Sequence, residues 1–153
     1  MPHATLLKFG YPENLLVETE HWALLVRPAQ VTLGSLVLCA TSDATAYGDL
    51  PGSAFTEQQR MVDLAERLLR EFVSYERINY LMLMMVDPHV HFHVIPRYEG
   101  TRSFAGTDFP DSGWPELPNL KDATAAPPAL IDELRKRAEG DDPGTEHGGR
   151  GKD

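Results

Sequence analysis

Three histidines stand at alternate positions in one short segment of the chain, at His89, His91 and His93. Successive side chains of a β-strand point to opposite faces, so a strand here places the three imidazoles in one row, each about 7 Å from the next. Exposed strand faces are usually filled by Thr, Ser, Lys or Glu, so such a row indicates chemistry. The residues between the histidines are apolar and are expected to face a core: Val90, Phe92 and Val94.

A row of imidazoles can act in two ways. A neutral imidazole is a good nucleophile near pH 7, and a neighbouring imidazolium can stabilise or protonate a phosphate oxygen. Imidazole is also a common zinc ligand, and alternate strand positions can supply ligands. The segment offers no cysteine and no further histidine or glutamate nearby to complete a metal site, so we expect no tightly bound zinc. Catalysis is the leading interpretation, with zinc binding or a merely solvated polar face as alternatives.

Hydrophobic periodicity predicts the elements that position this row. Apolar residues recur at three- and four-residue steps over Thr56–Glu76, which is typical of an amphipathic helix, and Thr56 with Gln59 predicts a capping box at its start. A weaker helix is expected over Pro128–Ala138, and the Gly- and Pro-rich segment Tyr98–Leu120 is expected to be irregular. Five segments are predicted strands: Leu15–Glu20, Trp22–Arg27, Ser35–Ala40, Arg77–Val86 and His89–Arg97.

The predicted strands are grouped around one long helix and do not alternate with helices. This order favours an α+β fold, with an antiparallel sheet of about five strands, the long helix and a second, C-terminal helix. A chain of 153 residues is long enough for one domain with a hydrophobic core. We place that domain at residues 1–139 and expect the Gly- and charge-rich residues 140–153 to form a disordered tail.

Charge and composition exclude several classes of function. The net charge of −9 argues against a nucleic-acid binder, which needs a basic face, but not against a small nucleotide. The single cysteine, Cys39, fits a reducing compartment and a buried position, so a cytoplasmic protein is expected. The longest apolar stretch, Ile78–Val86, is too short to cross a bilayer, and the N-terminus lacks the apolar core of a secretion signal. We therefore expect no membrane partner.

The histidine segment resembles the histidine-triad (HIT) family. His89–Ile95 matches the family motif His-φ-His-φ-His-φ-φ, where φ is apolar, and Pro88 and Pro96–Arg97 flank it as in the family. A weaker likeness extends over Leu15–Arg97, because Gly34–Leu38 and Asn79 fall where the family's order of elements places them. Trp114–Pro115 resembles an aromatic–proline element that some members carry after the triad.

The resemblance implies a role for each site residue. Family members bind nucleoside phosphates, and many cleave them at the α-phosphorus; their substrates include dinucleoside polyphosphates, such as diadenosine tetraphosphate, and nucleoside phosphoramidates. By this resemblance His91 attacks the phosphorus and forms a nucleotidyl-histidine, His93 donates to a phosphate oxygen, and His89 holds the site in register. Asn79 then contacts the phosphates or the ribose, and Trp114 stacks on a base or packs at a dimer interface.

Two departures from the family concern the substrate. Ser35 stands where many members carry a histidine, and Arg27 stands where several carry an Asn or Asp that accepts the ribose hydroxyls. Arginine cannot accept a hydrogen bond, so ribose recognition must use other groups. These two positions favour an alternative to the hydrolase, namely a nucleotide-binding or regulatory protein with low turnover. No tightly bound cofactor is expected, although magnesium is compatible with a polyphosphate substrate.

A homodimer is also expected, because the resemblance implies it and the predicted strand Arg77–Val86 is apolar on both faces. Such a strand must be covered on both sides, and the long helix can cover only one. The histidine face of the neighbouring strand is expected to stay open for substrate. A second copy is the simplest cover for the rest. The alternative is that the segment Tyr98–Leu120 folds back over that surface within one chain.

Overall fold

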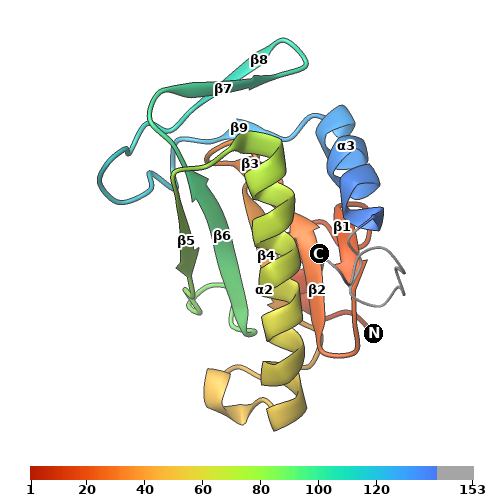
Figure 1. Cartoon of the computed structure of the whole chain (residues 1–153). Coiled ribbons are helices and arrows are strands. Elements are labelled where there is room, and N and C mark those ends of the chain that lie inside the picture. Colours follow the sequence, from red (N-terminus) through yellow and green to blue (C-terminus); the bar gives the residue numbers. More distant parts are fainter. Residues whose placement is uncertain (141–153) are drawn as a thin grey trace.

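The protein is an α+β structure built on a five-stranded antiparallel sheet (Figure 1), seen in a computed structural model that describes residues 1–140. The predicted fold class is therefore confirmed. The predicted tail lies outside the described residues from position 141 onward. In spatial order the strands of the sheet are β1 (Leu15–Glu18), β2 (Trp22–Val26), β4 (Leu36–Ala40), β6 (His91–Arg97) and β5 (Arg77–Leu81).

One face of the sheet is covered by the long helix α2 (Gly52–Val73), with α3 (Pro128–Glu139) beside it over β1 (Figure 1). The apolar stripe of α2 packs on residues that point toward it, among them Val94 in β6 and Val90 just before that strand. The helix starts four residues before the predicted Thr56, and Pro51 precedes it without a side-chain cap, so the predicted capping box is wrong. The physical reason is that the buried Ala54 already packs under Trp22, whose ring nitrogen donates to the Ala54 carbonyl.

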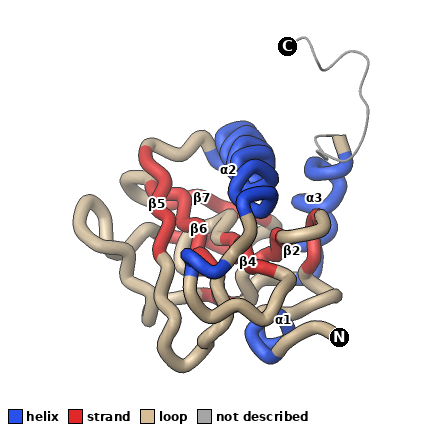
Figure 2. The backbone as a smooth tube through the Cα atoms, turned by 90° about the horizontal axis from the view of Figure 1, so that it is seen from below, coloured by secondary structure: helices blue, strands red, loops and turns tan. Residues whose placement is uncertain are grey.

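The opposite face of the sheet is covered by a short helix that the sequence analysis missed, α1 (Ala4–Lys8), which lies on the other side of the sheet from α2 (Figure 2). Leu6 and Phe9 pack on the inner strands β2 and β4, next to the buried Cys39. A helix of five residues is too short to show a helical period in the sequence. The expectation that the histidine face stays open is therefore wrong.

Two other predicted boundaries differ. β5 ends at Leu81, because its partner β6 begins only at His91 and the residues between must cross from one strand to the other. Met85 and Val86 consequently lie outside the sheet, 86% and 87% exposed. The segment predicted as irregular contains a hairpin, β7 (Thr101–Phe104) and β8 (Thr107–Pro110), which turns at Gly106 with a positive φ of 81°.

The remaining elements are small. β3 (Ala29–Gln30) pairs with β9 (Thr124–Ala125), and a single 3-10 turn, η1 (Tyr47–Asp49), precedes α2. Among residues 1–140, no helix combines the length and the apolar character that a membrane crossing requires.

Candidate active site

Strand register brings two of the three histidines to one face of the sheet. In β6, His91 and His93 point away from α2, while Phe92 and Val94 pack toward it, as the alternation predicts. Their rings stand edge to face with centroids 5.1 Å apart. His89 precedes β6, so the predicted strand begins two residues too early. Its side chain is positioned by other contacts, described below.

His91 has one ring nitrogen bound and the other free. The side chain is fully buried, and Nδ1 lies 2.7 Å from the backbone oxygen of His89. A carbonyl only accepts, so Nδ1 carries the proton and Nε2 carries the lone pair. Nε2 is buried without a hydrogen-bond partner among the described residues. Buried polar atoms are nearly always paired, so this free imidazole nitrogen is the feature expected of a nucleophile.

His93 is held in the complementary tautomer by Arg27. The Arg27 Nε donates to Nδ1 of His93 at 3.2 Å, and a guanidinium never accepts, so the ring proton lies on Nε2. The Nε2–H can then donate to an oxygen beside His91. Burial, together with the nearby positive charge of Arg27, lowers the pKa of His93 to about 4. The ring is therefore a neutral donor at physiological pH.

This lowered pKa predicts how stability depends on pH. The fold favours the neutral His93 ring, so its contribution is complete above the ordinary pKa of 6.5 and is lost as the pH falls from 6.5 toward 4. At about 1.4 kcal/mol per pKa unit, the loss is about 3 kcal/mol. In urea unfolding, the free energy of unfolding of the wild type should fall between pH 7 and pH 4.5, and His93→Gln should reduce this fall. Long-range ¹H–¹⁵N NMR should show the neutral, Nε2-protonated ring at pH 6, and a midpoint near 6.5 contradicts the assignment.

The three histidines meet the N-terminal segment, residues 3–9, which we call the cover. Phe9 contacts the rings of both His91 and His93, with centroids 5.6 and 5.5 Å away. The His3 ring stacks on His89 at 3.9 Å, and the buried Thr5 hydroxyl lies 2.9 Å from Nδ1 of His89. His89 therefore holds the cover against β6, and its backbone oxygen also accepts a hydrogen bond from Nδ1 of His91.

The cover is itself anchored at both ends. His3 accepts from the Leu6 amide and its Nε2 lies 2.8 Å from the Ala40 oxygen; burial lowers the pKa of this ring. At the other end Lys8 pairs with Asp87 at 2.8 Å. Neither His3 nor Lys8 lies near the histidine motif in the sequence, so this role is visible only in the structure.

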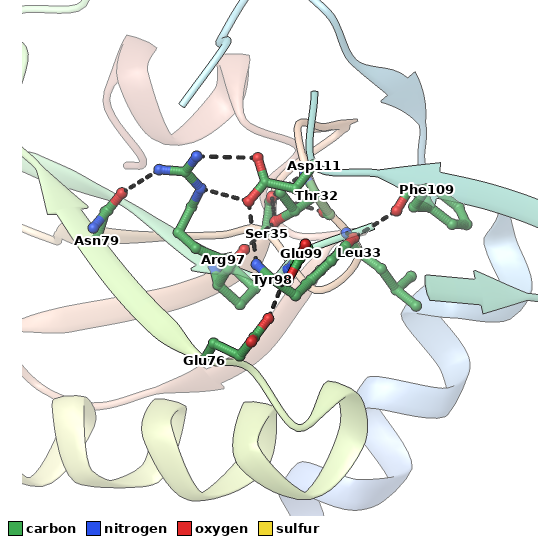
Figure 3. A network of polar contacts seen from close by, with 11 residues as sticks. Thr32, Leu33, Ser35, Glu76, Asn79, Arg97, Tyr98, Glu99, Phe109 and Asp111 are labelled. Carbon is green, nitrogen blue, oxygen red and sulfur yellow. Dashed lines mark hydrogen bonds and ion pairs between the residues drawn. The ribbon is translucent and has the colours of Figure 1, made fainter. Parts of the chain in front are cut away.

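A cavity of about 940 Å³ lies along β5, and its lining includes Asn79, Arg97 and Trp114. Asn79 pairs with Ile95 of β6, so it shares the face of His91 and His93. Its amide oxygen accepts from Arg97 Nη1 at 2.8 Å (Figure 3). The structure thus brings Asn79 and Trp114 to one cavity along β5, which none of His89, His91 and His93 lines.

Ser35 has a structural position. The residue is fully buried, its hydroxyl donates to the Thr32 carbonyl at 2.8 Å, and its Oγ accepts from the Thr32 amide at 3.0 Å. Its donor and its acceptor capacity are both used in the turn before β4. Arg27, by contrast, reaches His93. The structure therefore places Arg27 at the histidines and Ser35 in the turn behind them.

Comparison with known proteins gives the same fold. No protein-family model and no curated protein match the sequence. A histidine triad (HIT) protein from Sinorhizobium meliloti 1021 is 17% identical, with a TM-score of 0.72 over 92% of this chain and 96% of that one. The chain has the histidine-triad fold.

Two further solved structures share this fold. A Zn-bound histidine triad family protein from Mycobacterium smegmatis is 16% identical, with a TM-score of 0.57 over 88% of this chain and 90% of that one. The diadenosine triphosphate hydrolase of Plasmodium falciparum is 11% identical, with a TM-score of 0.58 over 84% and 76%. At such identities the likeness establishes the histidine-triad fold and no particular reaction.

Sequence reasoning missed three residues around the site, Thr5, Phe9 and Asp111. Asp111 receives two hydrogen bonds from Arg97, at 2.7 and 3.1 Å, and lies in the segment predicted as irregular. Phe9 and Thr5 belong to the unpredicted cover. The sequence carries only a weak signal for the cover: Leu6 and Phe9 stand three residues apart, as residues on one face of a helix do.

Proposed function

We propose that the protein is a cytoplasmic nucleotidyl hydrolase or transferase that cleaves nucleoside phosphates at the α-phosphorus through a nucleotidyl-histidine on His91. The observation that supports this most directly is the buried Nε2 of His91, which has no partner among residues 1–140 while Nδ1–H is bound to the His89 oxygen. Dinucleoside polyphosphates and nucleoside phosphoramidates are the proposed substrate classes.

In the first step the lone pair on Nε2 of His91 forms a bond to the α-phosphorus. The bond from phosphorus to the leaving group breaks, and its electron pair leaves with that group, which takes a proton from solvent. The His91 ring then carries phosphorus on Nε2 and a proton on Nδ1, so it is positively charged. The His89 oxygen, 2.7 Å from Nδ1, stabilises this charge.

In the second step water attacks the phosphorus and His91 leaves with the electron pair of the N–P bond. The water loses its proton to solvent, and the products are a nucleoside monophosphate and neutral His91. In both steps the Nε2–H of His93 donates to a non-bridging phosphate oxygen, where charge accumulates. Transfer to an acceptor other than water follows the same course. Because Nε2 of His91 is buried and Phe9 contacts both rings, we infer that the cover must shift before substrate reaches Nε2.

A panel of substrates tests the proposal. The purified protein is incubated with diadenosine tri- and tetraphosphate, their guanosine counterparts and adenosine phosphoramidate, and nucleoside monophosphate is measured by chromatography. Release from at least one substrate is expected, with an acid-labile nucleotidyl-protein in quenched samples. No release from any substrate contradicts the enzyme. The covered position of His91 favours the second candidate, a low-turnover nucleotide-binding protein, which the same panel reveals as binding of the nucleotides without release.

Zinc analysis separates catalysis from metal binding. We expect less than 0.1 zinc per chain in purified protein, as an order-of-magnitude limit. A metal ligand needs an unprotonated ring nitrogen, and His93 offers none, because its Nδ1 accepts from Arg27 and its proton lies on Nε2. In residues 1–140, no three His, Cys, Asp or Glu side chains come together as a metal site. Stoichiometric zinc that is lost in His89→Ala contradicts the catalytic proposal.

We also propose that the protein is a homodimer that joins along β5. The other edge strand of the sheet, β1, is closed by Arg135, which donates to the Leu15 and Glu13 oxygens. No strand pairs with the outer edge of β5 within residues 1–140. Large exposed apolar side chains lie near this edge, Met85 at 86% and Leu117 at 82%. The alternative to a dimer, in which the segment Tyr98–Leu120 folds back over this surface, has some support, because residues 114–118 line the cavity along β5.

Light scattering at micromolar concentration tests the dimer. We expect twice the 17.0 kDa of one chain. Met85→Glu and Leu117→Glu should shift the mass toward the monomer, because charged side chains are disfavoured at the centre of an interface. Leu7→Glu is the matched control, since Leu7 is also exposed, at 55%, but lies on α1. A wild-type mass near 17.0 kDa rules the dimer out.

A further inference from the structure

A buried ion pair lies at the end of β6, next to the cavity. Arg97 is 4% exposed and Asp111 is 6% exposed. The guanidinium donates to both carboxylate oxygens, from Nε at 2.7 Å and from Nη2 at 3.1 Å, and the Tyr98 amide donates to the same carboxylate at 3.2 Å (Figure 3). Such a bidentate pair fixes the plane of the guanidinium.

The third nitrogen of this guanidinium determines how Asn79 is oriented. Nη1 donates to the Asn79 amide at 2.8 Å. Because a guanidinium has no acceptor, the amide atom that faces it must be the oxygen, and the NH₂ must lie on the other side. Figure 3 shows this nitrogen directed away from Arg97. No hydrogen-bond acceptor for it lies within residues 1–140, so the free group of Asn79 is a donor.

The free donor lies close to the histidines. Asn79 is paired with Ile95, and His93 is two residues further along the same face of β6. Diagonal neighbours of this kind are about 7–8 Å apart. The side chain also lines the cavity. A ligand bound at His91 and His93 can therefore meet the amide NH₂ of Asn79.

We propose that Arg97, fixed by Asp111, is a positioning residue that turns the Asn79 amide so that its NH₂ donates to a phosphate oxygen of the substrate. This inference rests on the proposed function and deepens it, because it selects phosphate over ribose as the partner of Asn79. With its oxygen occupied, the amide cannot accept from a ribose hydroxyl. A donor beside the anionic group forms a charge-assisted hydrogen bond.

A double-mutant cycle tests whether Arg97 acts through Asn79. Asn79→Ala and Arg97→Lys are each expected to lower kcat/KM by about ten- to a hundredfold on the substrate that the panel identifies, which is the range for one hydrogen bond to a charged group. The double variant should be no worse than Asn79→Ala alone, since the lysine then has no amide left to misplace. Arg135→Lys is the matched control and should retain wild-type rates, because Arg135 donates to the backbone oxygens of Leu15 and Glu13 at the opposite edge of the sheet from β5.

Asn79→Asp gives the same test with little change of shape. The carboxylate still pairs with Arg97 but offers no donor, so the loss should equal or exceed that of Asn79→Ala. This variant decides the matter even where Arg97→Lys does not fold. Fully multiplicative losses in the cycle, or wild-type kcat/KM in Asn79→Asp, overturn the proposal.

A binding measurement separates this proposal from the proposed function. The side-chain amide of Asn79 is followed by ¹H–¹⁵N NMR while adenosine, AMP or inorganic phosphate is added. AMP and phosphate should shift its resonances and adenosine should not, and the AMP shift should shrink in Arg97→Lys. This result without any turnover in the panel refutes the enzyme and retains the positioning role. Turnover with an Asn79 amide that responds equally to adenosine and AMP refutes the positioning role and retains the enzyme.

Discussion

Replacement of His91 by alanine is expected to abolish nucleotide cleavage, lowering kcat by roughly four powers of ten or more. The reason is chemical: Nε2 of His91 is the only buried imidazole nitrogen without a partner in residues 1–140. His93 cannot replace it, because Arg27 holds the lone pair of that ring and leaves only a donor toward the substrate. Single-turnover assays with the substrate that the panel identifies measure the loss.

The control for this variant must account for burial. His91 is fully buried, so alanine removes packing as well as the nucleophile. His91→Asn retains polarity and part of the side-chain volume, and it should be equally inactive. Thermal unfolding of both variants shows how much of the loss of activity is due to misfolding. His21→Ala, at a histidine whose ring bonds Ser53 at the start of α2, on the sheet face opposite His91, should keep full activity. Near-wild-type kcat in both His91 variants would falsify the covalent mechanism.

Strand alternation was sufficient to predict the central part of the site. The pattern of histidine and apolar residues in β6 correctly predicted that His91 and His93 share one face and that Val94 packs on the long helix. Such a prediction succeeds because facing in a strand is a local property with a period of two. His89 lies before the strand, so the position of its ring depends on contacts with His3 and Thr5 that no local pattern predicts.

The rest of the site depends on contacts between residues far apart in the sequence. Phe9 reaches the histidines from more than eighty residues away, and Asp111 reaches Arg97 from the hairpin that follows the motif. Neither position has a local pattern that indicates its partner. The amide of Asn79 likewise depends on Arg97, so a choice between phosphate and ribose was not accessible from the sequence.

Arg27 shows how a departure from a family pattern can acquire meaning in the structure. An arginine at this position cannot accept from a ribose hydroxyl, so the sequence alone predicts only that ribose recognition uses other groups. The structure shows the guanidinium donating to Nδ1 of His93 and to the Ala29 oxygen. Its charge also contributes to the lowered pKa of His93. Arg27 thus helps to keep the His93 ring neutral, with its proton on Nε2.

Replacement of Asp111 by alanine is expected to lower the free energy of unfolding by about 3–5 kcal/mol, the range for breaking a buried ion pair from one side. The Arg97 guanidinium would keep its charge in a position that is 4% exposed, with Asn79 as its remaining partner. The Tyr98 amide would lose its acceptor as well. Urea unfolding at pH 7 measures the change.

The surface pair of Lys8 and Asp87 provides the matched control. It has the same length, 2.8 Å, as a good buried contact, but Lys8 is 52% exposed. Asp87→Ala should therefore cost less than about 1 kcal/mol, because water solvates the lysine that remains. Asp111→Asn keeps the shape and two acceptor lone pairs on its remaining oxygen, so it should fall between the two alanine variants. If Asp111→Ala and Asp87→Ala lower the free energy of unfolding equally, Arg97 is not held as a buried charge. The ion pair then does not fix the guanidinium that orients the Asn79 amide.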